Sequence, residues 1–154
     1  MRAVTSVDQK NLGRQGYRNS SFSSITVMAT AIAAEPLCMF IVVRKDLAKS
    51  LQWPTGSVIT QACHAATAIL QQTKDDDNTK EYLKDIHNMR KVVLETKNAA
   101  SLEKLADALV EHEIPLFRWT EQPENIVTAF ATAPLRERST EVKAIFKKYS
   151  SLYR

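Results

Sequence analysis

The side chains best suited to chemistry lie on one predicted helix, residues 54–72, which follows a short apolar strand. At about 100° per residue, four polar side chains fall on one side of this helix, opposite an apolar stripe that runs from Val58 to Leu70. They are Ser57, Thr60, Gln61 and His64. Because imidazole titrates near neutral pH, His64 could act as a general base or donate a hydrogen bond to an ester oxygen. The competing interpretation, a histidine on a solvated helix face, is the one that spacing alone favours.

A cluster of cations follows the apolar strand. Arg44, Lys45 and Lys49 could contact a nucleic-acid backbone, or they could simply belong to a solvated loop. The formal net charge of +4 does not decide between these readings, because residues 1–27 hold four cations and one acid and so carry +3 of it. An RNA-binding surface on the remaining chain must therefore be a local patch.

Several kinds of site are excluded by the residues available. Cys38 and Cys63 belong to no metal-binding motif, so we predict no metal site and two reduced thiols inside the cell. The chain has 3 glycines, which excludes a glycine-rich phosphate cradle. The longest apolar run, residues 37–43, is too short to span a bilayer, so we predict no membrane partner.

The apolar periodicity indicates the elements that must hold these residues. Strands are predicted at 38–43, 91–95, 116–119 and 126–133, and helices at 54–72, 79–88, 98–110 and 139–149, with Asn98 as a helix N-cap. This order predicts a three-layer α/β/α fold around a mixed, mostly parallel four-stranded sheet. Ligands in such folds gather at the carboxyl ends of the strands, which here means residues 44–53 and 120–125.

Residues 1–36 differ from the rest of the chain, because they are rich in Ser, Thr and Ala and hold few acids. Two interpretations compete: a transit peptide for a mitochondrion or plastid, or a disordered extension ahead of a folded domain at residues 37–154. Without a transit peptide, the expected location is the cytoplasm.

Two motifs in order resemble a known family. The run FIVVRKDL from Phe40 to Leu47, followed by TQACHAA from Thr60 to Ala66, resembles the type 2 peptidyl-tRNA hydrolases of archaea and eukaryotes. In that family a V-V-R-x-D-L strand end leads into a helix that opens G-K-x-A-A-Q-C-x-H-A. The resemblance covers nearly all of residues 37–154. Through Trp53-Pro54 and the run from Trp119 to Asn125, it is closer to the eukaryotic branch of peptidyl-tRNA hydrolase domain-containing proteins.

The resemblance implies hydrolysis, without a cofactor, of the ester that joins a peptide to its tRNA. Peptidyl-tRNA is then the partner, and a homodimer is left open. The family's lysine at the helix start falls on Ser57, its aspartate after the third strand falls on Thr120, and its nearby threonine falls on Glu124. Catalysis then needs another arrangement, or it is lost and the chain is a module that binds tRNA or a protein.

A working arrangement assigns a role to each candidate residue. His64 would orient or deprotonate a water, and Glu121 would assist as a base or orient the histidine. Gln61 and Asn125 would donate hydrogen bonds to the developing oxyanion. The expected substrate-binding set is Arg44, Lys45, Asp46 and Lys49 together with Gln61 and Asn125, in which the three cations hold tRNA phosphates.

Overall fold

The apolar run near residue 40 forms the central strand of a sheet. The computed structural model of the protein describes residues 35–136 and 138–154. Within them, β1 (Cys38–Arg44) is buried at every position after Cys38, as expected for a strand covered on both faces. The predicted extension, residues 1–36, lies outside the described residues apart from its last two positions.

Four further strands complete a mixed sheet in the order β3-β4-β1-β2-β5. They are β2 (Arg90–Thr96), β3 (Leu116–Glu121), β4 (Ile126–Thr132) and β5 (Ser151–Leu152). β1 pairs in parallel with β2 and antiparallel with β4. β3 pairs antiparallel with β4, and β5 pairs antiparallel with β2.

Two features of the predicted sheet were wrong. The sheet has five strands rather than four, because the two-residue strand β5 is too short to show a periodic pattern. It is also not mostly parallel, since β1–β2 is the one parallel pair among the strands of residues 35–136 and 138–154. β3 runs in the same direction as β1, but the short turn after it returns the chain as β4, which then lies between β3 and β1.

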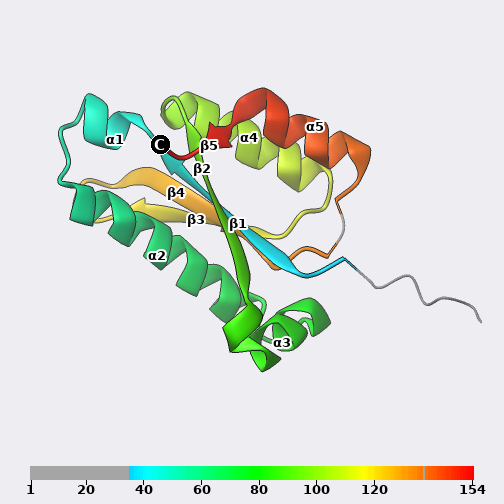
Figure 1. The fold of residues 1–154 in the computed structure, drawn as a ribbon. Coiled ribbons are helices and arrows are strands. Elements are labelled where there is room, and N and C mark those ends of the chain that lie inside the picture. The colour runs from blue at the N-terminus through cyan, green and yellow to red at the C-terminus, as the bar shows by residue number, and fades with distance from the viewer. Residues whose placement is uncertain (1–34, 137) are drawn as a thin grey trace, which may run out of the picture. The chain divides into compact units, whose positions relative to one another are not determined.

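Helices cover both faces of this sheet, as predicted. Figure 1 shows α2 (Thr55–Gln72) on one side and α4 (Ala99–Glu111) with α5 (Thr140–Tyr149) on the other. Each side has its own cluster of buried apolar residues, and β1 contributes alternate side chains to the two clusters. None of the helices in the described residues is long and apolar enough to cross a membrane.

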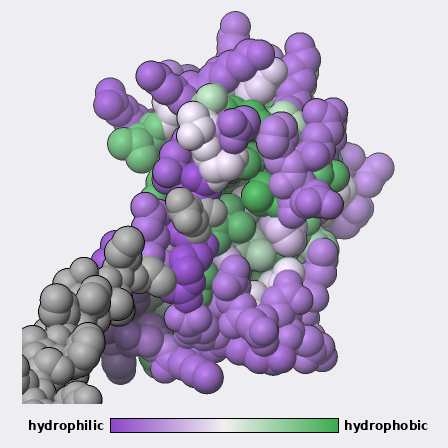
Figure 2. Space-filling view, turned by 90° about the vertical axis from the view of Figure 1, so that its right-hand side faces the viewer, coloured by the Kyte–Doolittle hydropathy of each residue, from purple (hydrophilic) through white to green (hydrophobic). Residues whose placement is uncertain are grey.

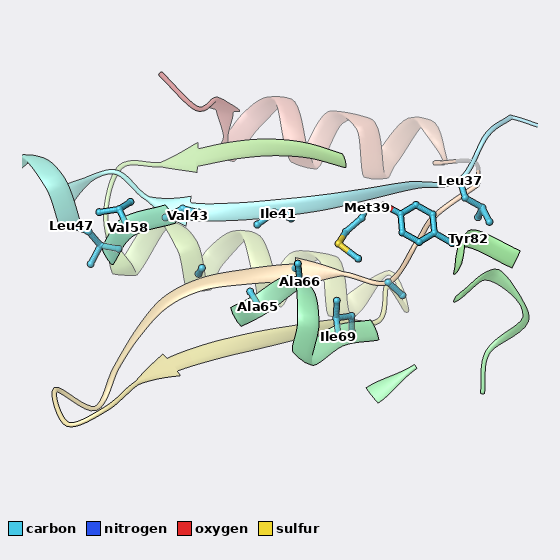
Figure 3. Packing of buried hydrophobic residues seen from close by; sticks show 13 residues of the cluster. Leu37, Met39, Ile41, Val43, Leu47, Val58, Ala65, Ala66, Ile69 and Tyr82 are labelled. Atoms are coloured by element: carbon cyan, nitrogen blue, oxygen red, sulfur yellow. The ribbon is translucent and has the colours of Figure 1, made fainter. Parts of the chain in front are cut away.

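Small side chains let α2 lie close to the sheet. Ala65 and Ala66 of the helix belong to the same buried cluster as Ile41 and Val43 of β1, which Figure 3 shows. Close packing of this kind fixes the position of the helix relative to the strand ends. The polar residues in the first turns of α2 are therefore held at the carboxyl end of β1.

Shorter elements fill the connections. The predicted loop after β1 contains a helical turn, α1 (Asp46–Lys49), and the predicted short helix is α3 (Asp77–Lys84) followed by the 3-10 turn Ile86–Asn88. The predicted cap of α4 is confirmed, because the Asn98 side chain accepts a hydrogen bond from the Ser101 backbone N–H at 3.0 Å. Ser139 caps α5 in the same way.

Candidate functional site

A polar cleft of about 230 Å³ lies where α2 begins and β3 ends. It is lined by Trp53, Pro54, Ser57, Gln61, Glu121, Gln122 and Glu124. Pro54 immediately precedes α2. Ser57 and Gln61, from the first two turns of this helix, form one wall of the cleft. Glu121 is the last residue of β3, and the turn after it forms the facing wall. The cleft therefore lies at the strand ends where the sequence predicted a ligand site.

Gln61 is the most constrained polar side chain of the cleft, with 1% of its surface exposed. Its Oε1 accepts a hydrogen bond from the Thr128 hydroxyl at 2.7 Å, and its Nε2 donates to the Ser57 carbonyl at 3.1 Å. These two bonds fix both the position of the amide and its orientation. Because an amide nitrogen carries two hydrogens, one donor remains for a ligand in the cleft.

His64 and Glu121 contact the same indole ring. The imidazole stacks on Trp119 with ring centroids 4.4 Å apart and planes at 19°. The indole Nε1–H of Trp119 donates to Glu121 Oε2 at 2.7 Å. Among the described residues no hydrogen bond joins His64 directly to Glu121, whereas Trp119 contacts both. His64 is absent from the cleft lining, whereas Glu121 is part of it.

Buried Arg44 and half-buried Asp46 form an ion pair at the end of β1. The Arg44 guanidinium donates from Nε and Nη2 to the two Asp46 carboxylate oxygens at 3.0 and 2.7 Å, and from Nη1 to the Val127 carbonyl at 3.0 Å. This planar fork ties the end of β1 to α1 and β4. The structure therefore gives Arg44 internal partners, and its contact with tRNA phosphate stays a prediction.

Lys45 and Lys49 point to different surroundings. Lys45 forms an ion pair with Glu95 at the end of β2, away from the residues that line the cleft. Burial of Glu95 would raise the pKa of its carboxyl, but hydrogen bonds from Lys45, the Arg154 backbone N–H and the Ser151 hydroxyl outweigh it and lower that pKa. Lys49 is exposed in the last turn of α1.

Asn125 lies in the turn between β3 and β4 rather than in the cleft lining. Its φ of 54° is in the left-handed region, which asparagine tolerates better than most residues. Its side-chain oxygen accepts a hydrogen bond from Gln122 at 3.4 Å. Of the predicted site, the structure thus places Gln61 and Glu121 in the lining of one cleft. His64, stacked on Trp119, and Asn125, in the turn, are not part of that lining.

Sequence reasoning missed two residues that position this site. Thr128 holds the Gln61 amide, and Trp119 joins His64 to Glu121. A threonine inside the apolar run of β4 was the available signal, because a fully buried hydroxyl needs a partner. For Trp119 the available signal was its indole N–H, a donor that usually finds an acceptor when the ring is packed.

The electrostatics of the cleft are unusual for a site that handles a polyanion. Glu121 and Glu124 are its charged residues, and no Lys, Arg or His is among its lining. Ser57, where the resemblance places a lysine, lines the cleft and is exposed. The described residues also hold no group of His, Cys, Asp or Glu arranged to bind a metal ion. The groups present are a carboxylate base and neutral hydrogen-bond donors.

A larger hollow lies at the other end of β1 and contains none of the predicted site residues. It measures about 720 Å³ and combines apolar side chains such as Phe40 and Val92 with Arg90, Lys91 and Arg138. Figure 2 views this end and shows hydrophobic surface in the middle, surrounded by hydrophilic side chains. Burial raises the pKa of the Cys38 thiol there, although Arg138 and Arg90 partly oppose the shift.

Comparison with known proteins finds a matching family and two similar relatives. Residues 37–152 match the family described as peptidyl-tRNA hydrolase PTH2. The chain is 42% identical over 132 residues to a human protein named "Putative peptidyl-tRNA hydrolase PTRHD1", covering 84% of this chain and 92% of that protein. The mouse protein of the same name is 38% identical over 133 residues, covering 86% of this chain and 94% of that protein.

Proposed function

Because the chain belongs to the PTH2 family of peptidyl-tRNA hydrolases, we propose that it hydrolyses the ester between a peptide and tRNA. Water adds to the ester carbonyl, the bond to the ribose oxygen breaks, and the products are a free peptide and a reusable tRNA. The observation that carries this proposal is the presence of Glu121 and the fixed Gln61 amide in one cleft at the strand ends.

Glu121 is the general base of this proposal. It lines the cleft, and its Oε2 is held by the Trp119 indole N–H, which leaves Oε1 to accept a proton from water. Gln61 donates its remaining amide hydrogen to the carbonyl oxygen, where negative charge develops. Both groups are preorganised by bonds to Thr128 and Trp119, which are not part of the cleft lining.

His64 acts on this base through Trp119. The stacked imidazole fixes the plane of the indole, and the indole N–H in turn fixes the Glu121 carboxylate. His64 is then a positioning residue, although a direct role as a base is the other reading of its chemistry. The substrate-binding roles of Arg44, Lys45, Asp46 and Lys49 belong to the same proposal, with Lys49 as the exposed cation.

The test measures release of tRNA from N-acetylated aminoacyl-tRNA by the full chain. Glu121→Gln keeps an acceptor for the Trp119 N–H but removes the base, so turnover should fall by about 10²- to 10⁴-fold. Glu111→Gln, an exposed glutamate at the end of α4, is the matched control and should leave turnover unchanged. Full activity of Glu121→Gln removes Glu121 from the mechanism.

A second candidate function is a module that binds tRNA without cleaving it. The absence of a cation from the cleft lining favours it, since neutral donors stabilise an oxyanion less than a charged one. In the same assay, this function predicts that the wild-type chain releases tRNA no faster than the uncatalysed reaction while it still binds tRNA in a salt-sensitive manner.

A further inference from the structure

The two parallel strands at the centre of the sheet send the chain to opposite faces. β1 and β2 are neighbours, and each ends at the same edge of the sheet. After β1 the chain crosses to α2 on one face, and after β2 it crosses to α4 on the other (Figure 1). Diverging connections of this kind open a crevice outside the carboxyl ends of the strands, where ligands of α/β proteins bind.

A hollow of about 300 Å³ occupies this position. It is distinct from the cleft described above, with which it shares no lining residue. Lys45 enters from the end of β1, and Glu95, Thr96 and Lys97 enter from the end of β2. The last turn of α5 and the start of β5 close it with Lys148 and Ser151.

The hollow holds uncompensated positive charge. The Glu95 carboxylate is already used by Lys45, the Ser151 hydroxyl and the Arg154 backbone N–H. Lys97 and Lys148 form no ion pair with any residue in the described part of the chain. Both lysines are exposed, and Lys148 lies over the Tyr149 ring at 4.8 Å from its centroid, a contact that leaves its charge without a carboxylate. Two cations can therefore pair with an anionic ligand.

A second observation also indicates that this hollow binds a ligand. Thr96 is 2% exposed, and its hydroxyl is the one buried side-chain polar atom in the described residues without a hydrogen-bond partner. Buried hydroxyls are almost always partnered, so an unpartnered one in the wall of a cationic hollow requires an explanation. An acceptor oxygen that entered between the lysines would supply the missing partner.

We propose that this hollow binds phosphate groups of a phosphate ester. Two lysines without a carboxylate partner in the described residues match the charge of a phosphate dianion or of two neighbouring diester phosphates, whereas a carboxylate would leave charge uncompensated. The phosphates can come from the backbone of tRNA or from a free nucleotide, because both present the same oxygens. This proposal does not depend on catalysis, since a chain that only bound tRNA would use the same hollow.

The test titrates the full chain with deacylated tRNA and, separately, with adenosine 5′-monophosphate. Lys97→Gln/Lys148→Gln should raise the Kd for the bound probe about tenfold or more, and for tRNA it should lower the salt slope of binding by about 2. The matched control is Lys104→Gln/Lys143→Gln, which removes the same charge from exposed positions on α4 and α5. It should leave both affinities near those of wild type.

Thr96→Val tests the hydroxyl without changing the shape of a strand residue. It should raise the melting temperature of the free protein, because it removes an unsatisfied buried group, and still weaken phosphate binding several-fold. An effect confined to tRNA identifies RNA as the phosphate source, and an effect confined to the mononucleotide identifies a free nucleotide. Equal losses in the lysine pair and its control, or unchanged affinities in both Lys97→Gln/Lys148→Gln and Thr96→Val, overturn the proposal.

Discussion

Gln61 of α2 accepts a hydrogen bond from Thr128 of β4, and both side chains are fully buried. The bond joins residues 67 positions apart and crosses from a helix to the strand beneath it. A neutral pair of this kind is costly to break, because the partner that remains cannot reach water. The same bond also fixes the orientation of the Gln61 amide in the cleft lining. The stability of the fold and the geometry of the candidate site therefore depend on one contact.

Thr128→Val is therefore expected to lower the free energy of unfolding by about 1–3 kcal/mol, because it leaves the Gln61 carbonyl buried without a donor. Urea denaturation measures the change. Thr67→Val, at an exposed threonine on the same helix, is the control and should stay within about 0.5 kcal/mol of wild type. Gln61→Leu combined with Thr128→Val should recover part of the loss, and strictly additive losses in this cycle contradict the coupling.

The fork between Arg44 and Asp46 carries a second prediction. Arg44→Lys keeps the charge but cannot reproduce two parallel bonds to the carboxylate and a third to the Val127 carbonyl. We expect a loss of about 1–3 kcal/mol in the free energy of unfolding, at the lower end because Asp46 is partly exposed to solvent. Lys49→Arg, at an exposed lysine five residues later, is the control and should have little effect. Equal stability of Arg44→Lys and wild type contradicts a structural role for the fork.

Much of the fold could be predicted from local pattern. The apolar runs located β1 to β4, and helical periodicity located α2, α4 and α5, each within a few residues of the observed bounds. The two elements that were missed, α1 and β5, have four and two residues, too few for any period to show. The position of β4 between β3 and β1 could not be predicted either, because it depends on how the whole hairpin docks.

The candidate site was less predictable, and α2 shows why. Periodicity put Gln61 on the polar side and Ile59 on the apolar stripe, yet Gln61 is 1% exposed and Ile59 is 58% exposed. The face that a helix buries is decided by the sheet beneath it, and here Thr128 provides a polar partner on that sheet. The stacking of His64 on Trp119 likewise joins two elements whose contact no spacing reveals.

The pKa of Glu95 gives a pH-dependent prediction. Burial opposes the shift, but the bonds from Lys45, the Arg154 N–H and Ser151 hold this pKa below its ordinary value of 4.5. A lowered carboxyl pKa contributes stability that is present above pH 4.5 and is lost as the pH falls through the folded-state value. Glu95→Gln should therefore be less stable than wild type at pH 7, and the difference should shrink below pH 4.5 in urea denaturation repeated across pH. A difference that stays constant from pH 7 to pH 3 would contradict this linkage.

His64 stacks on Trp119, and two explanations of the role of His64 predict different effects when this stacking ring is changed. If His64 positions the indole, and through it Glu121, then His64→Phe preserves an aromatic ring on Trp119 and should retain most of the turnover with N-acetylated aminoacyl-tRNA. His64→Ala removes the ring and should lower turnover by about 10-fold or more, because the carboxylate loses its fixed orientation. If His64 is itself the base, both variants lose about 10²- to 10⁴-fold in turnover. His87→Phe, at an exposed histidine far along the chain, controls for the added ring. Retention of activity in His64→Phe together with loss in His64→Ala is the result that assigns the positioning role.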